Sequence, residues 1–183
     1  FSRSFSSGIR GHSCWNQHTY IAPDRIPIEE TYRLIRAKRP EALISFKQGA
    51  TGTEDYASPE FHFASSGQHL RAKGNERGAK IADRAWEINR RKHNEICMTL
   101  QDDGWGYTEK SGHKGADILW GSLAYALKNN CNLLANTGPL PDGSIHPEDL
   151  KTLRAVGKRI REEGWPSEEQ AILPSQKSSA GGA

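Results

Sequence analysis

The hydrophobic positions of the chain follow two spacings, one typical of amphipathic helices and the other of short buried strands. Apolar residues at helical spacing predict helices over residues 28–39, 79–91, 117–128 and about 147–163. Short apolar runs between turn residues predict strands at 42–46, 95–100 and 131–135. Residues 64–78 hold few apolar side chains and predict a mobile loop.

The predicted elements alternate between helix and strand, which indicates parallel strands covered by helices. Both a doubly wound sheet and a (β/α)8 barrel have this order. Each predicted strand is followed by a long polar loop with a Trp or a carboxylate, and barrel active sites lie in such loops at the carboxyl ends of the strands. A full barrel needs about 250 residues. We therefore expect an α/β fold that is a partial (β/α)8 TIM barrel, roughly its C-terminal half.

Composition narrows the classes of partner. The 183 residues are 35% hydrophobic and 26% charged, with a net charge of +3 and both signs interleaved. This balance favours a solvated surface over a nucleic-acid-binding stripe. No apolar run reaches the about 20 residues of a membrane span. The segment 1–22 lacks a start Met and the apolar region of a signal peptide, so we expect it to come from the middle of a longer chain.

Cysteine and histidine spacing gives no sign of a metal or cofactor. Cys14, Cys97 and Cys131 form no CxxC pair, and Cys97 and Cys131 lie in apolar runs where core packing is the default role. The seven histidines include no HxxxH or HxH, and His93 and His146 are more typical of hydrogen-bonded supports at element ends. We expect no metal site and no cofactor.

The loop after the first predicted strand offers three carboxylates, Glu54, Asp55 and Glu60. A carboxylic acid there, beside Tyr56 and Phe61, would suit a general acid with a raised pKa. Solvated loop carboxylates are the alternative. The sequence "GATG" at 49–52 could cradle a phosphate, but it lacks the Lys-Ser/Thr of a P-loop.

The loop after the second predicted strand combines two acids with two aromatic residues: Asp102, Asp103, Trp105 and Tyr107. Aromatic faces beside carboxylates suit a sugar ring, whereas packing over the barrel rim is the alternative. In the third loop, "PDGS" lacks the alternating acidic ligands of a calcium loop and predicts a turn. We expect this loop to be a rigid structural rim.

Three blocks of the sequence together resemble a known family. They are "ALISFKQGATGTEDYASPE", "KHNEICMTLQDDGWGY" and "NCNLLANTGPLPDGSIHPEDLKTLRAVGKRIREEGWP", and they resemble the α-L-fucosidases of glycoside hydrolase family 29, in that order. The resemblance implies a retaining hydrolase of terminal α-L-fucose that uses two carboxyl groups about 5 Å apart. It assigns residues 23–166 to the C-terminal β/α units of the catalytic barrel and leaves 167–183 as a flexible tail.

The resemblance also implies roles for individual residues. Glu60 in "SPEF" matches the family's acid/base motif, Lys47 stands where a basic residue contacts the sugar or the nucleophile, and Trp105 in "GWGY" resembles a wall of the fucose pocket. The implied partner is a fucosylated oligosaccharide or glycoconjugate. A secreted, periplasmic or lysosomal setting follows by family analogy only, and exposed barrel edges predict self-association.

The sequence departs from the family where the nucleophile should stand. The family has an Asp in a Trp-x-Asp motif, whereas "CWNQHTY" has Asn16 and Gln17 there. An amide carries no charge to attack an oxocarbenium-like centre. The upstream half of the barrel and the C-terminal β-sandwich of many members are also not recognised. These departures predict a fragment that lacks the nucleophile, with a non-catalytic fucose-binding remnant as the alternative. A phosphate-binding α/β domain is a third, generic alternative.

Overall fold

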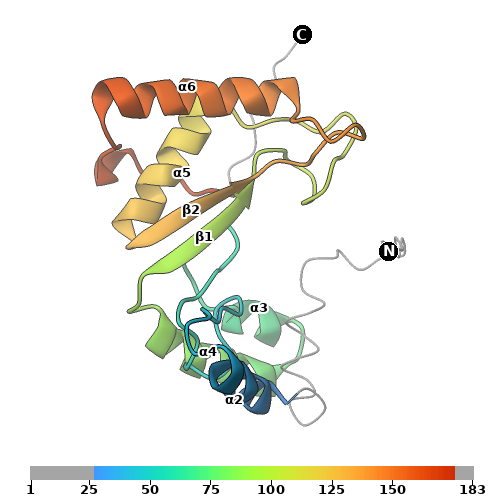
Figure 1. The fold of residues 1–183 in the computed structure, drawn as a ribbon, viewed down its shortest axis with the longest axis vertical. Coiled ribbons are helices and arrows are strands. Elements are labelled where there is room, and N and C mark those ends of the chain that lie inside the picture. The colour runs from blue at the N-terminus through green and yellow to red at the C-terminus, as the bar shows by residue number, and fades with distance from the viewer. Residues whose placement is uncertain (1–26, 176–183) are drawn as a thin grey trace.

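A computed structural model describes residues 27–175 of the chain. Two parallel strands lie at its centre, with two long helices on one side of them and three helices at the opposite end (Figure 1). The predicted segment 1–22 lies outside the described residues. In chain order the elements are α2 (Ile28–Lys38), α3 (Gly67–Ala72), α4 (Glu76–Asn89), β1 (Asn94–Thr99), α5 (Ala116–Lys128), β2 (Cys131–Asn136), α6 (Pro147–Glu163) and the 3-10 helix η1 (Glu168–Gln170).

The β1–α5–β2 segment confirms the predicted β/α alternation. The strands pair in parallel from Asn94 opposite Cys131 to Thr99 opposite Asn136. A parallel pair needs a crossover connection, and α5 supplies it. The mixed helix and strand content with this parallel pair gives an α/β fold.

Two further extended segments precede β1 in the chain; neither forms a regular strand, and residues 57–61 pair with β1. Residues 57–61 exchange backbone hydrogen bonds with β1, from Glu95 N–H to Ala57 C=O (2.9 Å) and from Phe61 N–H to Cys97 C=O (2.9 Å). The predicted strand at 42–46 is wrong, because this stretch makes only a single parallel bridge, Ser45 to Tyr56. Lys47 has φ of +42°, a left-handed conformation that ends the extended stretch.

The predicted mobile loop at 64–78 is also wrong, since it contains α3 and the start of α4. Leu70 is 1% exposed and packs against Ala79 and Ala82 of α4. The Asn75 side chain caps α4 by accepting a hydrogen bond from Gly78 N–H (2.9 Å). Arg71 also pairs with Asp83 of α4 (2.5 Å), so apolar and polar contacts with α4 together order this segment.

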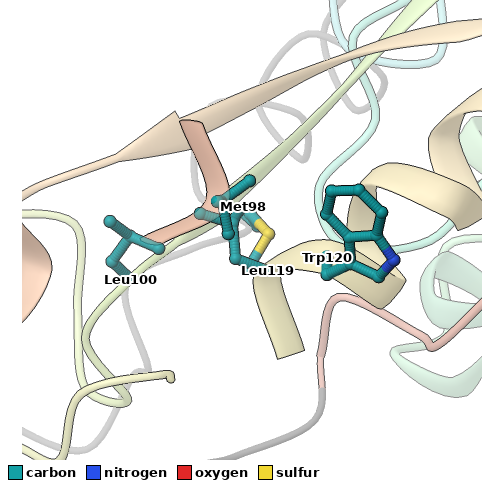
Figure 2. Close-up of a cluster of buried hydrophobic side chains, with 5 residues drawn as sticks. Met98, Leu100, Leu119 and Trp120 are labelled. Carbon is teal, nitrogen blue, oxygen red and sulfur yellow. The ribbon is translucent and has the colours of Figure 1, made fainter. Parts of the chain in front are cut away.

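Alternate side chains of β1 point to opposite faces, as in any strand. Met98 and Leu100 are fully buried and pack with Leu119 and Trp120 of α5 and with Val156 of α6 (Figure 2). This cluster fixes α5 and α6 over one face of the strands. Cys97 and Thr99, which alternate with these residues, therefore belong to the opposite face.

The first residues of the predicted tail, 167–175, are ordered against α5. Ile172 N–H donates to Gly121 C=O (2.9 Å), and the Trp120 indole N–H donates to Gln170 Oε1 (3.2 Å). Ser167 and Gln170 cap η1 reciprocally. The ordered structure thus continues beyond residue 167. Within residues 27–175, no helix is long and apolar enough to cross a membrane.

Candidate functional site

The face of the strands opposite α5 carries polar side chains from three neighbouring extended segments. Glu60 is bridged to Cys97, and Cys97 lies opposite Leu134 in the β1–β2 register. Bridged residues point to the same face, so these three side chains form one row. Ser58 and Glu95 lie two residues before Glu60 and Cys97 in their segments. The Ser58 hydroxyl donates a hydrogen bond to Glu95 Oε1 (3.0 Å).

Lys47 and Glu60 form an ion pair on this face. Their side chains are 32% and 20% exposed, so both groups remain within reach of a ligand. Lys47 and Phe61 both have left-handed backbones, with φ of +42° and +60°. Such conformations are uncommon for residues other than glycine and gather at functional sites. Here they turn the chain at the ends of both extended segments, next to the ion pair.

Trp105 lies at the same end of the strands. Its ring is 5.5 Å from the ring of Phe61, at an angle of 45°. The Asn136 side chain, at the last position of β2, donates to the Trp105 carbonyl (2.7 Å). Phe61 directly follows Glu60 and packs against the cluster of Met98 and Leu100, so its ring contact places Trp105 near the end of the segment that carries Glu60. A carboxylate and an ammonium can bind the hydroxyl groups of a sugar, and an aromatic ring can pack against its CH groups.

Glu54, by contrast, has a structural role. Burial raises the pKa of its carboxyl, but hydrogen bonds from the Asn89 side chain and from the N–H groups of Ala50 and Thr51 lower it further, to about 2. Gly52 N–H also donates to it (2.9 Å). Glu54 is therefore anionic and enclosed. A general acid must carry a proton and reach the substrate, so Glu54 does not suit that role. The "GATG" amides already bind this carboxylate, so the loop does not offer them to a phosphate.

Asp55 is also committed to structural contacts. It accepts a hydrogen bond from Ile44 N–H (2.6 Å) and pairs with Arg36 (2.8 Å). The backbone hydrogen bond from Ile44 is the main cause that holds the pKa of Asp55 below its ordinary value, despite some burial, and Arg36 adds to it. Of the three carboxylates in the first loop, Glu60 alone is paired with a basic side chain at the predicted site.

The loop after β1 is anchored by Asp102, which pairs with Lys114 (3.3 Å). The two side chains are 9% and 3% exposed, so this pair stabilises the loop and is not open to a ligand. Asp103 is exposed, and its backbone N–H donates a hydrogen bond to Ser111 Oγ (3.1 Å). The loop thus contributes Trp105 to the site and uses Asp102 to hold its own shape.

The two described cysteines lie in different surroundings. Cys131 packs in the core with Ile96 and Ala126, as predicted, and burial raises the pKa of its thiol to about 12. Cys97 is buried too, and its thiol points toward the carbonyls of Ser58 and Pro59. Burial raises the pKa of Cys97 as well, with Lys47 opposing this shift. Cys97 therefore lies on the face of Lys47 and Glu60.

Glu95 and Cys97 were missed as site residues because β1 is buried on both faces. Five of its six residues are buried, so its composition hides the alternation that distinguishes the two sides. The bridge to Glu60 is a long-range contact, and the sequence alone carries no signal for it.

The histidines that were expected to act as supports do so. His93 contacts Asn130 and Asn132 (3.1 and 3.2 Å), and the His146 side chain accepts a hydrogen bond from Glu148 N–H (3.3 Å). "PDGS" forms the predicted turn, with Asp142 accepting from Ser144 N–H (2.9 Å) and Gly143 at φ of +84°. Among residues 27–175, no cluster of three or more His, Cys, Asp or Glu side chains could hold a metal ion.

Comparison with known proteins identifies the family of this chain. Residues 47–164 match the family model described as Alpha-L-fucosidase. An α-L-fucosidase of Branchiostoma floridae is 34% identical over 73 residues, which span 38% of this chain and 16% of the relative.

Solved structures agree with the sequence match. α-L-Fucosidase isoenzyme 1 from Paenibacillus thiaminolyticus superposes with a TM-score of 0.53 at 25% identity, over 74% of this chain and 30% of that one. The Thermotoga maritima α-fucosidase superposes with a TM-score of 0.51 at 17% identity, over 75% of this chain and 26% of that one, which shows a shared fold. The chain spans less than a third of the length of each of these relatives.

Proposed function

Because this chain belongs to the α-L-fucosidase family of glycoside hydrolases, we propose that it forms the C-terminal part of a (β/α)8 catalytic barrel. In the whole protein, that barrel would hydrolyse terminal α-L-fucose from glycoconjugates by a retaining double displacement. The observation that carries this proposal is the Lys47–Glu60 ion pair at the carboxyl ends of parallel segments, beside Phe61 and Trp105. Barrel active sites lie at that end of the strands.

In this proposal Glu60 is the acid/base. A retaining enzyme protonates the leaving oxygen with one carboxyl group while a second attacks the sugar, and the first group then activates water. Lys47 orients the Glu60 carboxylate in the free site. A hydroxyl of the bound sugar then accepts a hydrogen bond from the Lys47 ammonium. Glu60, no longer paired, takes up a proton from water and can donate it to the leaving oxygen. The Trp105 ring packs against the CH groups of the fucose.

Turnover of 4-nitrophenyl α-L-fucoside by the purified chain tests the assignment. If the chain is active, we expect Glu60→Gln to lower kcat by about 100-fold or more. Glu41→Gln is the control, because Glu41 is an exposed carboxylate away from the site. Activity that survives Glu60→Gln but is lost in Glu95→Gln would overturn the assignment and move the acid/base role to the neighbouring carboxylate on the same face.

A non-catalytic fucose-binding protein is the second candidate, and Asn16 and Gln17 favour it. These residues lie outside the described structure, at the sequence position where the family's nucleophile is expected. A folded chain that binds fucose by calorimetry but releases no 4-nitrophenol fits this candidate. Gain of turnover in Asn16→Asp or Gln17→Asp would instead identify an enzyme that lacks only its nucleophile. Absence of both binding and turnover at millimolar fucose would contradict both candidates.

A further inference from the structure

Four consecutive backbone carbonyls of the loop after β1, at residues 103–106, accept hydrogen bonds from two side-chain amides. The Gln101 amide donates to three of them, the carbonyls of Asp103 (2.8 Å), Gly104 (3.2 Å) and Gly106. The Asn136 amide donates to the fourth, the carbonyl of Trp105 (2.7 Å). Gln101 lies two positions after β1, and Asn136 is the last residue of β2. These two side chains, named here the carboxamide clamp, therefore join the Trp105 loop to the ends of both strands.

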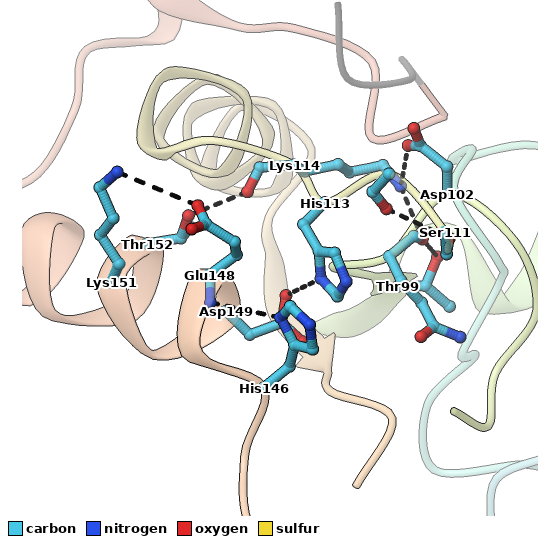
Figure 3. Close-up of polar contacts among 12 residues, drawn as sticks. Thr99, Asp102, Ser111, His113, Lys114, His146, Glu148, Asp149, Lys151 and Thr152 are labelled. Carbon is cyan, nitrogen blue, oxygen red and sulfur yellow. Dashed lines mark hydrogen bonds and ion pairs between the residues drawn. The ribbon is translucent and has the colours of Figure 1, made fainter. Parts of the chain in front are cut away.

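Gln101 is itself held firmly at the end of β1. It is 1% exposed, and its own carbonyl accepts hydrogen bonds from the Thr99 hydroxyl (2.7 Å) and the Lys114 ammonium (3.0 Å). Lys114 also pairs with Asp102, and the Lys114 carbonyl accepts from the Thr152 hydroxyl of α6 (2.9 Å) (Figure 3). Because Gln101 is anchored to β1 and through Lys114 to α6, its side chain can hold the loop in one conformation.

The loop after β2 contacts the backbone next to Trp105 as well. A methyl group on Gly138 would lie 2.7 Å from the Tyr107 backbone nitrogen and 2.8 Å from the Gly106 carbonyl carbon. The backbones of the two loops therefore touch, two residues after Asn136. The backbone on either side of Trp105 is thus fixed from β1 by Gln101 and from β2 by Asn136 and Gly138.

This backbone determines where the Trp105 ring lies. The ring is 5.5 Å from the ring of Phe61, which directly follows Glu60. A side chain takes its direction from its backbone and a small set of rotamers, so a shift of the Trp105 backbone would move the ring relative to Phe61. Carbonyls that lose buried donors must find new partners, and in a loop this requires a change of conformation.

We propose that Gln101 and Asn136 are positioning residues, which hold the Trp105 ring in the place where it packs against a bound sugar. Neither side chain needs to touch the sugar, because both act through the Trp105 backbone. The part of the proposal that concerns sugar binding rests on the proposed role of Trp105 in fucose binding. The part that concerns the clamp rests on the hydrogen bonds alone.

Fluorine NMR of the full chain labelled with fluorotryptophan tests the clamp without any sugar. The Trp105 signal is identified by its loss in Trp105→Phe. Gln101→Met keeps the length of the side chain and removes its donors, so we expect the Trp105 signal to shift or broaden while that of core Trp120 keeps its place. Asn136→Leu removes the donor to the Trp105 carbonyl and should have the same effect. If one of these variants does not fold, the other decides the outcome.

Asn94→Leu is the matched control, because Asn94 is also 1% exposed and lies at the other end of β1. Its amide likewise donates to backbone carbonyls, those of Asn89 (2.9 Å) and Lys92 (2.8 Å). Asn94→Leu and Gln101→Met should each lower Tm by about 3–10 °C, but Asn94→Leu should leave the Trp105 signal unchanged. A Trp105 signal that ignores the loss of the clamp, or that responds equally to Asn94→Leu, would overturn the proposal.

Fucose binding by calorimetry tests the link between the clamp and the site. Gln101→Met should weaken binding about 2–10-fold, and by no more than Trp105→Ala does. In the Trp105→Ala background it should have no further effect, because the clamp acts through the ring. An equal loss in both backgrounds would overturn the link, since it would show a general effect on the fold. Absence of fucose binding in the wild type would count against the proposed function, while the fluorine spectra would still decide the clamp.

Discussion

At the scale of single residues, chemistry depends on what surrounds a carboxylate more than on where it stands in the sequence. Glu54 and Glu60 lie six positions apart in one loop. Glu54 is 1% exposed and enclosed by N–H donors, whereas Glu60 faces Lys47 on the polar side of the strands. The first arrangement stabilises a permanent anion, and the second leaves a carboxyl group that can exchange its partner.

This difference predicts that Glu54 is a stability residue. Its pKa of about 2 lies below the ordinary 4.5, so its contribution to stability is present above about pH 4.5 and is lost as the pH falls toward 2. Glu54→Gln should cost about 1.5–3 kcal/mol at pH 7 and flatten this part of the pH profile. Urea unfolding at pH 3 and 7 measures both effects. Glu41→Gln should stay within about 0.5 kcal/mol of the wild type, and an equal loss in both variants would contradict the assignment.

At the scale of elements, the segment 167–175 acts as a strap across α5. A methyl group on Gly121 would lie 2.6 Å from Ile172 Cδ1 and 2.8 Å from Ile172 Cβ. Gly121→Ala should therefore cost about 1–3 kcal/mol through overpacking, although alanine favours helices. The second substitution Ile172→Ala should recover most of that loss in a double-mutant cycle measured by thermal melting.

Gly157→Ala in α6 is the matched control for Gly121→Ala. A methyl group there would meet only the Arg161 guanidinium, at 3.5 Å, so helix propensity should dominate and raise stability by about 0.5–1 kcal/mol. If Gly121→Ala stabilised the protein as much as Gly157→Ala does, residues 167–175 would not pack on α5 as described.

The elements that the sequence predicts well are those whose own pattern determines them. α4, α5 and α6 follow their apolar spacing. α2 ends at Lys38, shortly before Pro40, as expected. α3 was missed because its contacts with α4, through buried Leu70 and through the Arg71–Asp83 ion pair, are a tertiary effect. The strand expected at 42–46 fails at Lys47, whose left-handed backbone no local pattern indicates.

The same division applies to the candidate site. The sequence predicts Lys47, Glu60 and Trp105 at one rim because loops after parallel strands share an edge of the sheet, and this placement stays a prediction. The positions of Glu95 and Cys97 beside Glu60 depend on the bridge between residues 60 and 97, which joins segments far apart in the sequence. Register across such a bridge is set by packing and turns, so spacing within each segment could not supply it.

At the scale of the whole molecule, helices cover one face of the two strands, and the opposite face is buried along most of β1 but partly exposed at β2. α5 and α6 bury Met98 and Leu100, whereas Leu134 on the opposite face is 44% exposed (Figure 1). Within residues 27–175, β2 pairs with β1 alone, so its outer edge presents backbone groups without a strand partner. An open strand edge beside an exposed leucine favours pairing with another chain.

This geometry predicts self-association of the chain through β2. Sedimentation velocity across micromolar concentrations should show an average mass that rises with concentration. Leu134→Lys should shift the chain toward the monomer, because a lysine beside the edge opposes strand pairing. Leu34→Lys on α2 removes another exposed leucine (57% exposed) at the opposite end of the molecule and should leave association unchanged. A chain that stays monomeric at every concentration, or responds equally to both substitutions, would show that the β2 edge is not the contact.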